Sequence, residues 1–246
     1  KINKHFPSIF TLINLFLGFI AIINIHQQNY IISCYILFLA AAFDSIDGKL
    51  ARMFGFSTDF GKEIDSLADM VSFCLAPAFL IYTLYTYKMP GIFGEFIASI
   101  PLIMGAIRLA QFNIIKEQPS HSFIGLPTPV NALAIVSLVL FIEHIKLVRP
   151  EFSPLILLIP IIIILSFLML SQIQYPKFPM WSFNVGKENN YRLFGVIFFI
   201  ICFIIGIFMG YSYLVLSIFI VYYLLLGIIQ HIINNFGKIK TKNQGI

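Results

Sequence analysis

Acidic residues are concentrated in one short stretch of this chain. Residues 44–69 read DSIDGKLARMFGFSTDFGKEIDSLAD and hold six of the eleven Asp and Glu residues. Four of them recur at helical spacing, two before the turn-like sequence GFST at 55–58 and two after it: Asp44, Asp47, Asp65 and Asp69. Residues three or four positions apart share a helix face, and two helices joined by a short turn run antiparallel. The spacing therefore predicts that these four carboxylates meet around one point, whereas Asp59 and Glu63 fall off the shared faces.

Four carboxylates around one point would repel one another unless positive charge compensates them. Ligand sets made only of oxygen suit hard divalent cations such as Mg²⁺ or Mn²⁺. Four carboxylates could hold two such ions, an arrangement that clamps the attacking and leaving oxygens in phosphoryl transfer. Neighbouring residues suit a phosphate ligand, because Gly48 and Gly61 allow close approach to the backbone and the planar guanidinium of Arg52 matches phosphate oxygens.

The composition places this stretch in a membrane protein. The chain is 59% hydrophobic and only 11% charged, with a mean hydropathy of +0.91, whereas soluble domains carry roughly a quarter charged residues. We predict an all-α polytopic bundle in one integral membrane domain, residues 1–246, with both termini in the cytoplasm. Its catalytic core would cover about 7–180, followed by two further helices within about 193–233 and a basic tail, 234–246. The predicted spans are 8–25, 30–53, 60–87, 91–115, 127–144, 153–171, 193–210 and 212–233.

The distribution of Lys and Arg orients these spans. With the N-terminus in the cytoplasm, twelve Lys and Arg residues fall in inside segments and three fall in outside loops. Cytoplasmic loops are enriched in Lys and Arg, so both termini and the acidic stretch are predicted to face the cytoplasm. The same bias accounts for the formal charge of +5, and nucleic-acid binding is not expected.

The acidic stretch also resembles a known family. It matches D-x2-D-G-x2-A-R-x8-G-x3-D-x3-D at every fixed position and so resembles the CDP-alcohol phosphatidyltransferases. The resemblance implies that Asp44, Asp47 and Asp65 bind a first metal ion. It also implies that Asp44, Asp65 and Asp69 serve a second ion, with Asp69 as the candidate base. PSIFTLIN at 7–14 resembles the family's P-N-x-x-T-x-x-N segment, with Ser8 at the usual Asn position. The positions implied in CDP-diacylglycerol binding are Pro7, Ser8, Thr11, Gly48, Arg52, Thr58 and Gly61.

Other segments bear on the acceptor alcohol. SLADMVSFCLAPA (66–78), RLAQFN (108–113), GLPTP (125–129) and SQIQYPKF (171–178) resemble the phosphatidylserine synthase branch, although Gln111 departs from its usual R-L-A-R-F-N. We expect Lys62, Arg108 and Asn113 near the serine pocket. Each has an alternative: Lys62 could face water, Arg108 could pair with an acid of the metal site or a lipid phosphate, and Asn113 could cap its helix.

The expected reaction is transfer of the phosphatidyl group from CDP-diacylglycerol to L-serine, with CMP released, by a homodimer in the inner or plasma membrane. Its active site would face the cytoplasm. An alternative keeps the chemistry but uses glycerol 3-phosphate or inositol phosphate as acceptor. A divalent-cation transporter is disfavoured, because such sites lie near mid-bilayer and usually recur in repeated halves. Here the acids lie at one predicted membrane face and no second half mirrors them.

Overall fold

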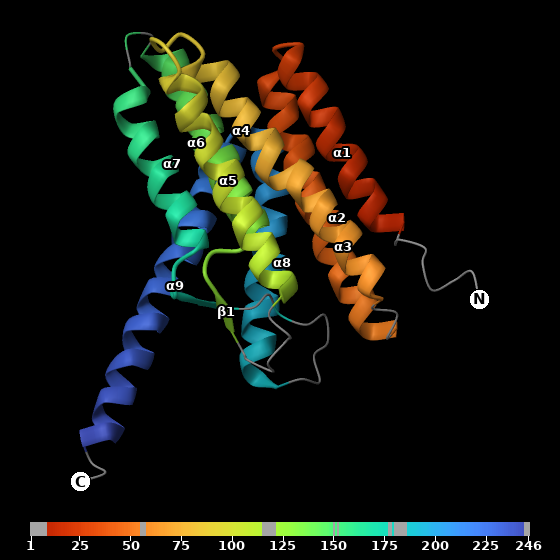
Figure 1. The fold of residues 1–246 in the computed structure, drawn as a ribbon, viewed down its shortest axis with the longest axis vertical. Helices are drawn as coiled ribbons and strands as arrows, with labels where there is room; N and C mark the ends of the chain where they lie inside the picture. Colours follow the sequence, from red (N-terminus) through yellow and green to blue (C-terminus); the bar gives the residue numbers. More distant parts are fainter. Residues whose placement is uncertain are drawn as a thin grey trace. The chain divides into compact units, whose positions relative to one another are not determined.

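The computed structural model describes residues 9–54, 58–114, 122–149, 151, 153–176, 179 and 186–243, with the backbone alone described at 48–54, 122, 187–188 and 234–243. The described residues are overwhelmingly helical, and their elements are shown in Figure 1. The α-helices are α1 (Ile9–His26), α2 (Tyr30–Phe54), α3 (Asp59–Asp69), α4 (Ala76–Ile81), α5 (Phe93–Ile114), α6 (Thr128–Val148), α7 (Leu155–Met169), α8 (Lys187–Met209) and α9 (Ser212–Asn243). Two π-helical segments, η2 (Met70–Leu75) and η3 (Tyr82–Thr86), and two strands, β1 (Ser122–Ile124) and β2 (Gln174–Pro176), complete them.

Seven helical segments of the described chain are long and apolar enough to cross a membrane. They span 9–26, 30–47, 59–86, 93–114, 128–148, 189–209 and 212–233. The eighth predicted span, 153–171, is the shorter apolar helix α7 of 15 residues, which covers roughly 22 Å of the 30 Å hydrocarbon core. The prediction of an all-α multi-pass membrane protein is confirmed, and the orientation of its termini stays a prediction.

The chain divides into two compact units. The first comprises residues 1–116 and 127–170, and the second comprises 117–126 and 171–246. The first unit therefore holds α1 to α7, and the second holds the two strands with α8 and α9. The predicted division into a core at 7–180, two further helices and a tail stays a prediction.

In the first unit, small side chains allow the helices to approach closely. Its interior holds Ala40 and Ala41 of α2, Phe73 of η2 and Ala132 of α6. A Cβ atom at Gly105 of α5 would lie only 2.3 Å from the Cys74 sulfur. Helices in membranes associate through such small residues, because lipid tails leave little hydrophobic force to drive them together.

Asp59–Thr86 forms one long helical run with π-helical turns inside it. Pro77 lacks an N–H group, and its ring clashes with the carbonyl four residues earlier in a regular α-helix. The preceding turn widens accordingly: the Ala76 N–H donates to the carbonyl of Val71, five residues back. The first π-helical turn begins directly after Asp69, so the backbone geometry changes at the end of the acidic stretch.

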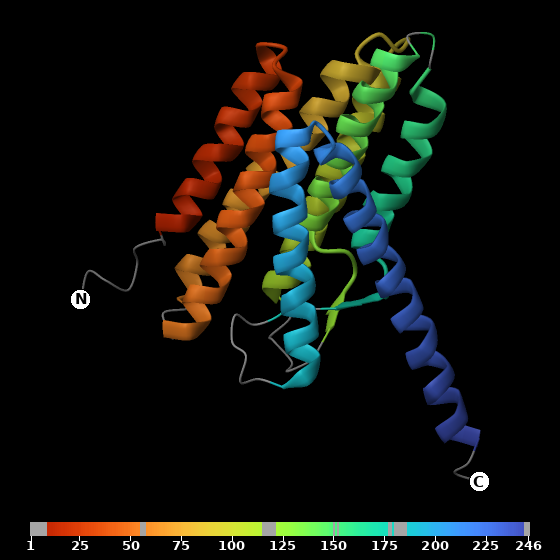
Figure 2. The ribbon, with the colours of Figure 1, turned by 180° about the vertical axis from the view of Figure 1, so that it is seen from behind.

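The second unit joins two segments that the sequence singles out. Strands β1 and β2 pair antiparallel, with Phe123 opposite Tyr175, and the Gly125 N–H donates to the Ile173 carbonyl over 2.8 Å. GLPTP at 125–129 is thereby tied through its first residue to the segment preceding YPKF. Figure 2 shows α8 and α9 of this unit as a helical hairpin, and its turn contains Gly210 at φ 78°, a backbone conformation that favours glycine.

Helix α9 holds this strand pair. The Tyr175 ring stacks on Tyr223 with 5.8 Å between centroids, and the Tyr223 hydroxyl donates to the Pro176 carbonyl over 3.0 Å. A Cβ atom at Gly227 would lie 2.3 Å from the Tyr175 ring, so a larger residue cannot occupy that position without a shift. Burial raises the pKa of Tyr175 to about 12, which keeps the phenol neutral.

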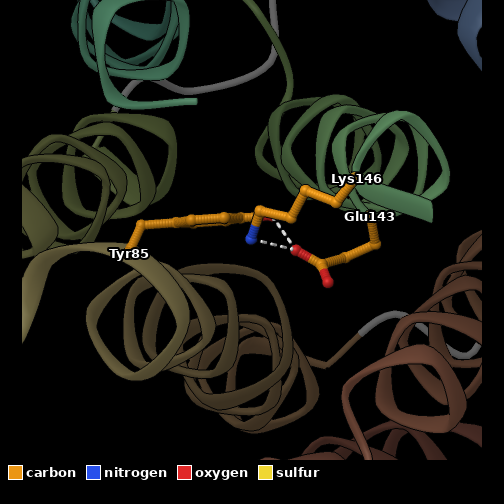
Figure 3. Close-up of polar contacts among 3 residues, drawn as sticks. All are labelled: Tyr85, Glu143 and Lys146. Carbon is orange, nitrogen blue, oxygen red and sulfur yellow. Dashed lines mark hydrogen bonds and ion pairs between the residues drawn. The ribbon is translucent and has the colours of Figure 1, made fainter. Parts of the chain in front are cut away.

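A polar cluster joins η3 to α6 in the first unit (Figure 3). The Tyr85 hydroxyl donates to Glu143 Oε1 over 2.9 Å, and Lys146 Nζ donates to the same oxygen over 2.8 Å. The Lys146 ammonium also lies 4.7 Å from the centroid of the Tyr85 ring. Tyr85 follows Asp69 by sixteen residues in one helical run, roughly 24 Å along its axis. The cluster therefore lies far from the acidic stretch and fixes the other end of the unit.

Replacing Glu143 with Ala should lower the free energy of unfolding by about 1–3 kcal/mol, because the buried Tyr85 hydroxyl would lose its acceptor. The measurement is thermal or denaturant unfolding of the purified protein in detergent. A Tyr85→Phe variant is the matched control, since the double variant should lose less than the sum of the two single losses. Strict additivity would show that the two groups do not interact.

Candidate active site

Three of the four predicted carboxylates lie together. One oxygen from each of Asp44, Asp65 and Asp69 falls within 4.8 Å of the other two. Asp44 comes from α2, whereas Asp65 and Asp69 lie one turn apart on α3. Asp69 is buried, with 8% of its surface exposed, and the other two are half-buried. Helices α2 and α3 thus bring these three carboxylates together, as the spacing predicts.

Asp47, the fourth carboxylate, lies beside this group. It is 6% exposed and accepts a hydrogen bond from the Thr11 hydroxyl of α1. It is also close enough to Asp65 for the two charges to interact. Thr11 was expected to contact CDP-diacylglycerol, and in this structure its hydroxyl proton is directed to Asp47.

Asn14 of α1 is a site residue that sequence reasoning did not select. Its amide Nδ2 donates to Asp69 Oδ1 over 3.1 Å, and the side chain is fully buried. A signal was present, because Asn14 follows Thr11 at helical spacing inside an otherwise apolar run. Helix α1 therefore supplies one donor to each of two neighbouring carboxylates.

A close helix contact keeps these donors in place. A Cβ atom at Gly18 would lie 2.2 Å from Ser72 Oγ and 2.9 Å from Ser72 Cα. The Ser72 hydroxyl in turn donates to the Asn14 carbonyl over 2.9 Å. Because Ser72 belongs to the π-helical turn after Asp69, this contact fixes α1 against the segment that carries the carboxylate.

The residues implied in nucleotide binding are partly described. The Thr58 hydroxyl caps the N-terminus of α3 by accepting from the Gly61 N–H over 3.0 Å. Its proton remains available to donate to another acceptor. Gly48 and Arg52 lie in the last two turns of α2, where only the backbone is described. Pro7 and Ser8 lie outside the described residues.

Of the three residues expected near serine, Asn113 forms hydrogen bonds with the helix that carries Asp65 and Asp69. Asn113 of α5 bridges to α3: it accepts from the Ser66 hydroxyl over 3.1 Å, and its Nδ2 donates to Glu63 Oε2 over 3.2 Å. Arg108, also on α5, is half-buried near the Phe112 ring, and its Nε is buried without a hydrogen-bond partner. Lys62 is exposed and forms no salt bridge with a described residue.

The cluster of Asp44, Asp65 and Asp69 fits a divalent cation. Its donors are all oxygen atoms from separate side chains, the set that hard cations prefer. Among the described side chains, no Lys or Arg forms a salt bridge with Asp65 or Asp69. Carboxylates buried so close together require a compensating charge, so this cluster could bind a metal ion.

The family comparison agrees with this geometry. The sequence model of the CDP-alcohol phosphatidyltransferase family matches residues 4–170, a range that includes every carboxylate of the cluster. The match covers more than half of the chain. This chain therefore belongs to the CDP-alcohol phosphatidyltransferase family.

Three curated proteins that share one enzyme name are similar to this chain. A CDP-diacylglycerol–serine O-phosphatidyltransferase of Helicobacter pylori strain J99 is 31% identical over 240 residues, which cover 97% of this chain and 96% of the relative. A protein of the same name from Methanocaldococcus jannaschii is 36% identical over 169 residues, or 69% of this chain and 72% of the relative. A third, from Bacillus subtilis strain 168, is 32% identical over 175 residues, covering 71% of this chain and 92% of the relative.

Replacing Gly18 with Val should displace α1 from η2, because the new side chain would overlap the backbone of Ser72. We expect a lower melting temperature and a weaker stabilisation by added Mn²⁺, since Thr11 and Asn14 would move away from Asp47 and Asp69. Thermal unfolding with and without Mn²⁺ measures both effects. Gly195→Val is the matched control, because nothing lies within 4 Å of a Cβ atom there. An unchanged Mn²⁺ effect in Gly18→Val would show that α1 does not position the carboxylates.

Proposed function

We propose that this protein transfers the phosphatidyl group of CDP-diacylglycerol to the hydroxyl of L-serine, giving phosphatidylserine and CMP. The observation that carries the proposal is the convergence of Asp44, Asp65 and Asp69 within the matched family segment. The choice of serine is supported by relatives that bear the serine O-phosphatidyltransferase name, one of which is matched over nearly its whole length.

Asp44, Asp47, Asp65 and Asp69 would hold two divalent cations, Mg²⁺ or Mn²⁺, which when bound supply positive charge to neutralise the diphosphate of CDP-diacylglycerol. The backbone positions of Gly48 and Gly61 would allow the nucleotide to approach closely. The guanidinium of Arg52 would orient the phosphates through its planar pair of donors. Pro7, Ser8, Thr11 and Thr58 are proposed to line the CDP-diacylglycerol site with them.

Asp69 is proposed as the base. As the serine oxygen bonds to the phosphorus on the lipid side, Asp69 accepts the hydroxyl proton. The bond from that phosphorus to the bridging oxygen then breaks, and CMP leaves. Asn14 supports this role, because its amide donor orients the Asp69 carboxylate through one of its oxygens.

Arg108 is proposed to bind the serine carboxylate. The level of Arg108 along the bundle, relative to Asp69, follows from two contacts between α5 and the helical run that carries Asp69. Asn113 contacts Ser66, and Gly105 contacts Cys74. Both fit one antiparallel register, since Gly105 precedes Asn113 by eight residues and Cys74 follows Ser66 by eight. In this register Arg108 lies at the depth of Val71, two residues beyond Asp69. Its buried, unpartnered Nε supports a role in binding an anionic group.

Lys62 and Asn113 are proposed to border the same pocket at its outer edge, where both side chains are exposed. The protein is proposed to be a homodimer of the inner or plasma membrane with its active site on the cytoplasmic side. The excess of Lys and Arg in the predicted inside segments supports this orientation. The family resemblance supports the dimer.

Purified protein in detergent should release CMP from CDP-diacylglycerol when L-serine and Mn²⁺ or Mg²⁺ are both present. Chelation with EDTA should stop the release, because the clustered carboxylates would lose their compensating charge. Chromatographic detection of CMP with and without serine is the measurement. Equal or faster release with glycerol 3-phosphate or inositol phosphate would overturn serine as the acceptor.

Replacing Asp69 with Asn should lower kcat by at least about a hundredfold, because an amide cannot accept the hydroxyl proton. Binding of CDP-diacylglycerol, measured by calorimetry, should persist. Asp59→Asn is the matched control, since Asp59 is an exposed residue in the first turn of the same helix and should leave kcat unchanged. Full activity of the Asp69 variant would remove this residue from the role of base.

A further inference from the structure

A buried amide on α6 has no hydrogen-bond partner among the described residues. The side chain of Asn131 is 0% exposed, and neither its Nδ2 nor its Oδ1 forms a hydrogen bond within the described part of the chain. Buried polar groups are nearly always paired, because burial removes the water that would otherwise bind them. An amide with both its donor and its acceptor unpaired is therefore expected to have a partner that arrives from outside the chain.

Packing places Asn131 near the acidic stretch. The next residue, Ala132, belongs to the same buried cluster as Phe73, which follows Asp69 by four residues. Thr128, three residues earlier on α6, lies beside Gly105 and Cys74, because its methyl group is 3.9 Å from a Cβ built on Gly105. Asn131 lies between these two contacts. Its depth in the first unit therefore corresponds to Phe73 and Cys74, about one helical turn or slightly more beyond Asp69.

Two further unpartnered atoms lie on helices that contact the same segment. Helices α1, α5 and α6 all pack against η2. Asn14 of α1 leaves its Oδ1 buried and unpaired, and Arg108 of α5 leaves its Nε buried and unpaired. Asn14 is held at Asp69 by its own hydrogen bond, and the register of α5 places Arg108 at the depth of Val71. Three helices that pack against one π-helical turn thus each carry a buried polar atom without a partner among the described residues.

The chemistry of these atoms suits an amino acid. Arg108 Nε and Asn131 Nδ2 are donors, which a carboxylate accepts, whereas Asn14 Oδ1 and Asn131 Oδ1 are acceptors, which an ammonium group satisfies. A glycerol or inositol phosphate would offer the acceptors only neutral hydroxyl donors, whereas an ammonium group offers charged donors, which form stronger hydrogen bonds. Serine carries its carboxylate and ammonium groups on Cα and its hydroxyl, the group that must reach Asp69, on the adjacent carbon.

We infer that Asn131 binds the acceptor amino acid, its Nδ2 donating to the carboxylate and its Oδ1 accepting from the ammonium group. The inference rests on the proposed function, because it requires that serine be the acceptor. It adds a specificity-determining residue on α6, a helix that contributes no carboxylate to the cluster of Asp44, Asp65 and Asp69.

The test is a comparison of steady-state kinetics between the wild type and Asn131→Leu, a change that keeps the size of the side chain and removes its polar atoms. The KM for L-serine should rise about tenfold or more, as expected for the loss of hydrogen bonds to charged groups. The KM for CDP-diacylglycerol should stay unchanged. The melting temperature without substrates should stay the same or rise, because an unpaired buried amide has been replaced by an apolar group.

Ser137→Ala is the matched control, a buried polar residue on the same helix that has interaction partners. It should leave the KM for serine unchanged. An unchanged KM for serine in Asn131→Leu would overturn the inference. Asn131→Ala serves as a second variant if Leu prevents folding, and loss of folding in both would assign the amide a structural role and also overturn it. A wild type that releases no CMP with serine would instead overturn the proposed function.

Discussion

The constraint on which the rest of the structure depends is the mutual repulsion of carboxylates held against an apolar bundle. Asp44, Asp65 and Asp69 approach within 4.8 Å of one another, and Asp69 is buried. Such a group is unstable unless hydrogen-bond donors and positive charge compensate it. The chain supplies donors from α1, with Asn14 at Asp69 and Thr11 at the neighbouring Asp47, and the cluster could bind a cation that adds the positive charge. The close contact of α1 with η2 then follows, because donors must be held within hydrogen-bond distance to compensate these charges.

Much of this could be predicted from the sequence. The spacing of the acidic residues predicted which would share a helix face, and the structure brings Asp44, Asp65 and Asp69 together. The helix break was also predictable, since Thr58 is a good N-cap residue and a glycine follows at the position that it binds. Hydropathy located the spans, but it overestimated α7, because the predicted span 153–171 included two residues on each side of the helix Leu155–Met169.

The features that could not be predicted depend on contacts between distant segments. Asn14 lies 55 residues from Asp69, and nothing local indicates which carboxylate an Asn of an apolar helix will meet. The π-helical turns depend on how the chain adapts to Pro77 within a packed bundle, where an ordinary kink was equally compatible with the sequence. Asn131 could not be recognised as unpaired until its burial and its surroundings were known. Pairing of β1 with β2 likewise joins segments that are about 50 residues apart.

The contact between Gly227 and Tyr175 bears on what α9 is for. A membrane anchor needs only sufficient length and hydropathy, so many different apolar sequences can form one. Helix α9 meets both requirements, yet it also has one face shaped to a single tyrosine ring of β2. Helix α9 therefore packs specifically against β2, and a generic apolar helix of equal length could not replace it. Fusion partners or tags that rotate this helix by part of a turn would release the strand pair while leaving the protein fully inserted in the membrane.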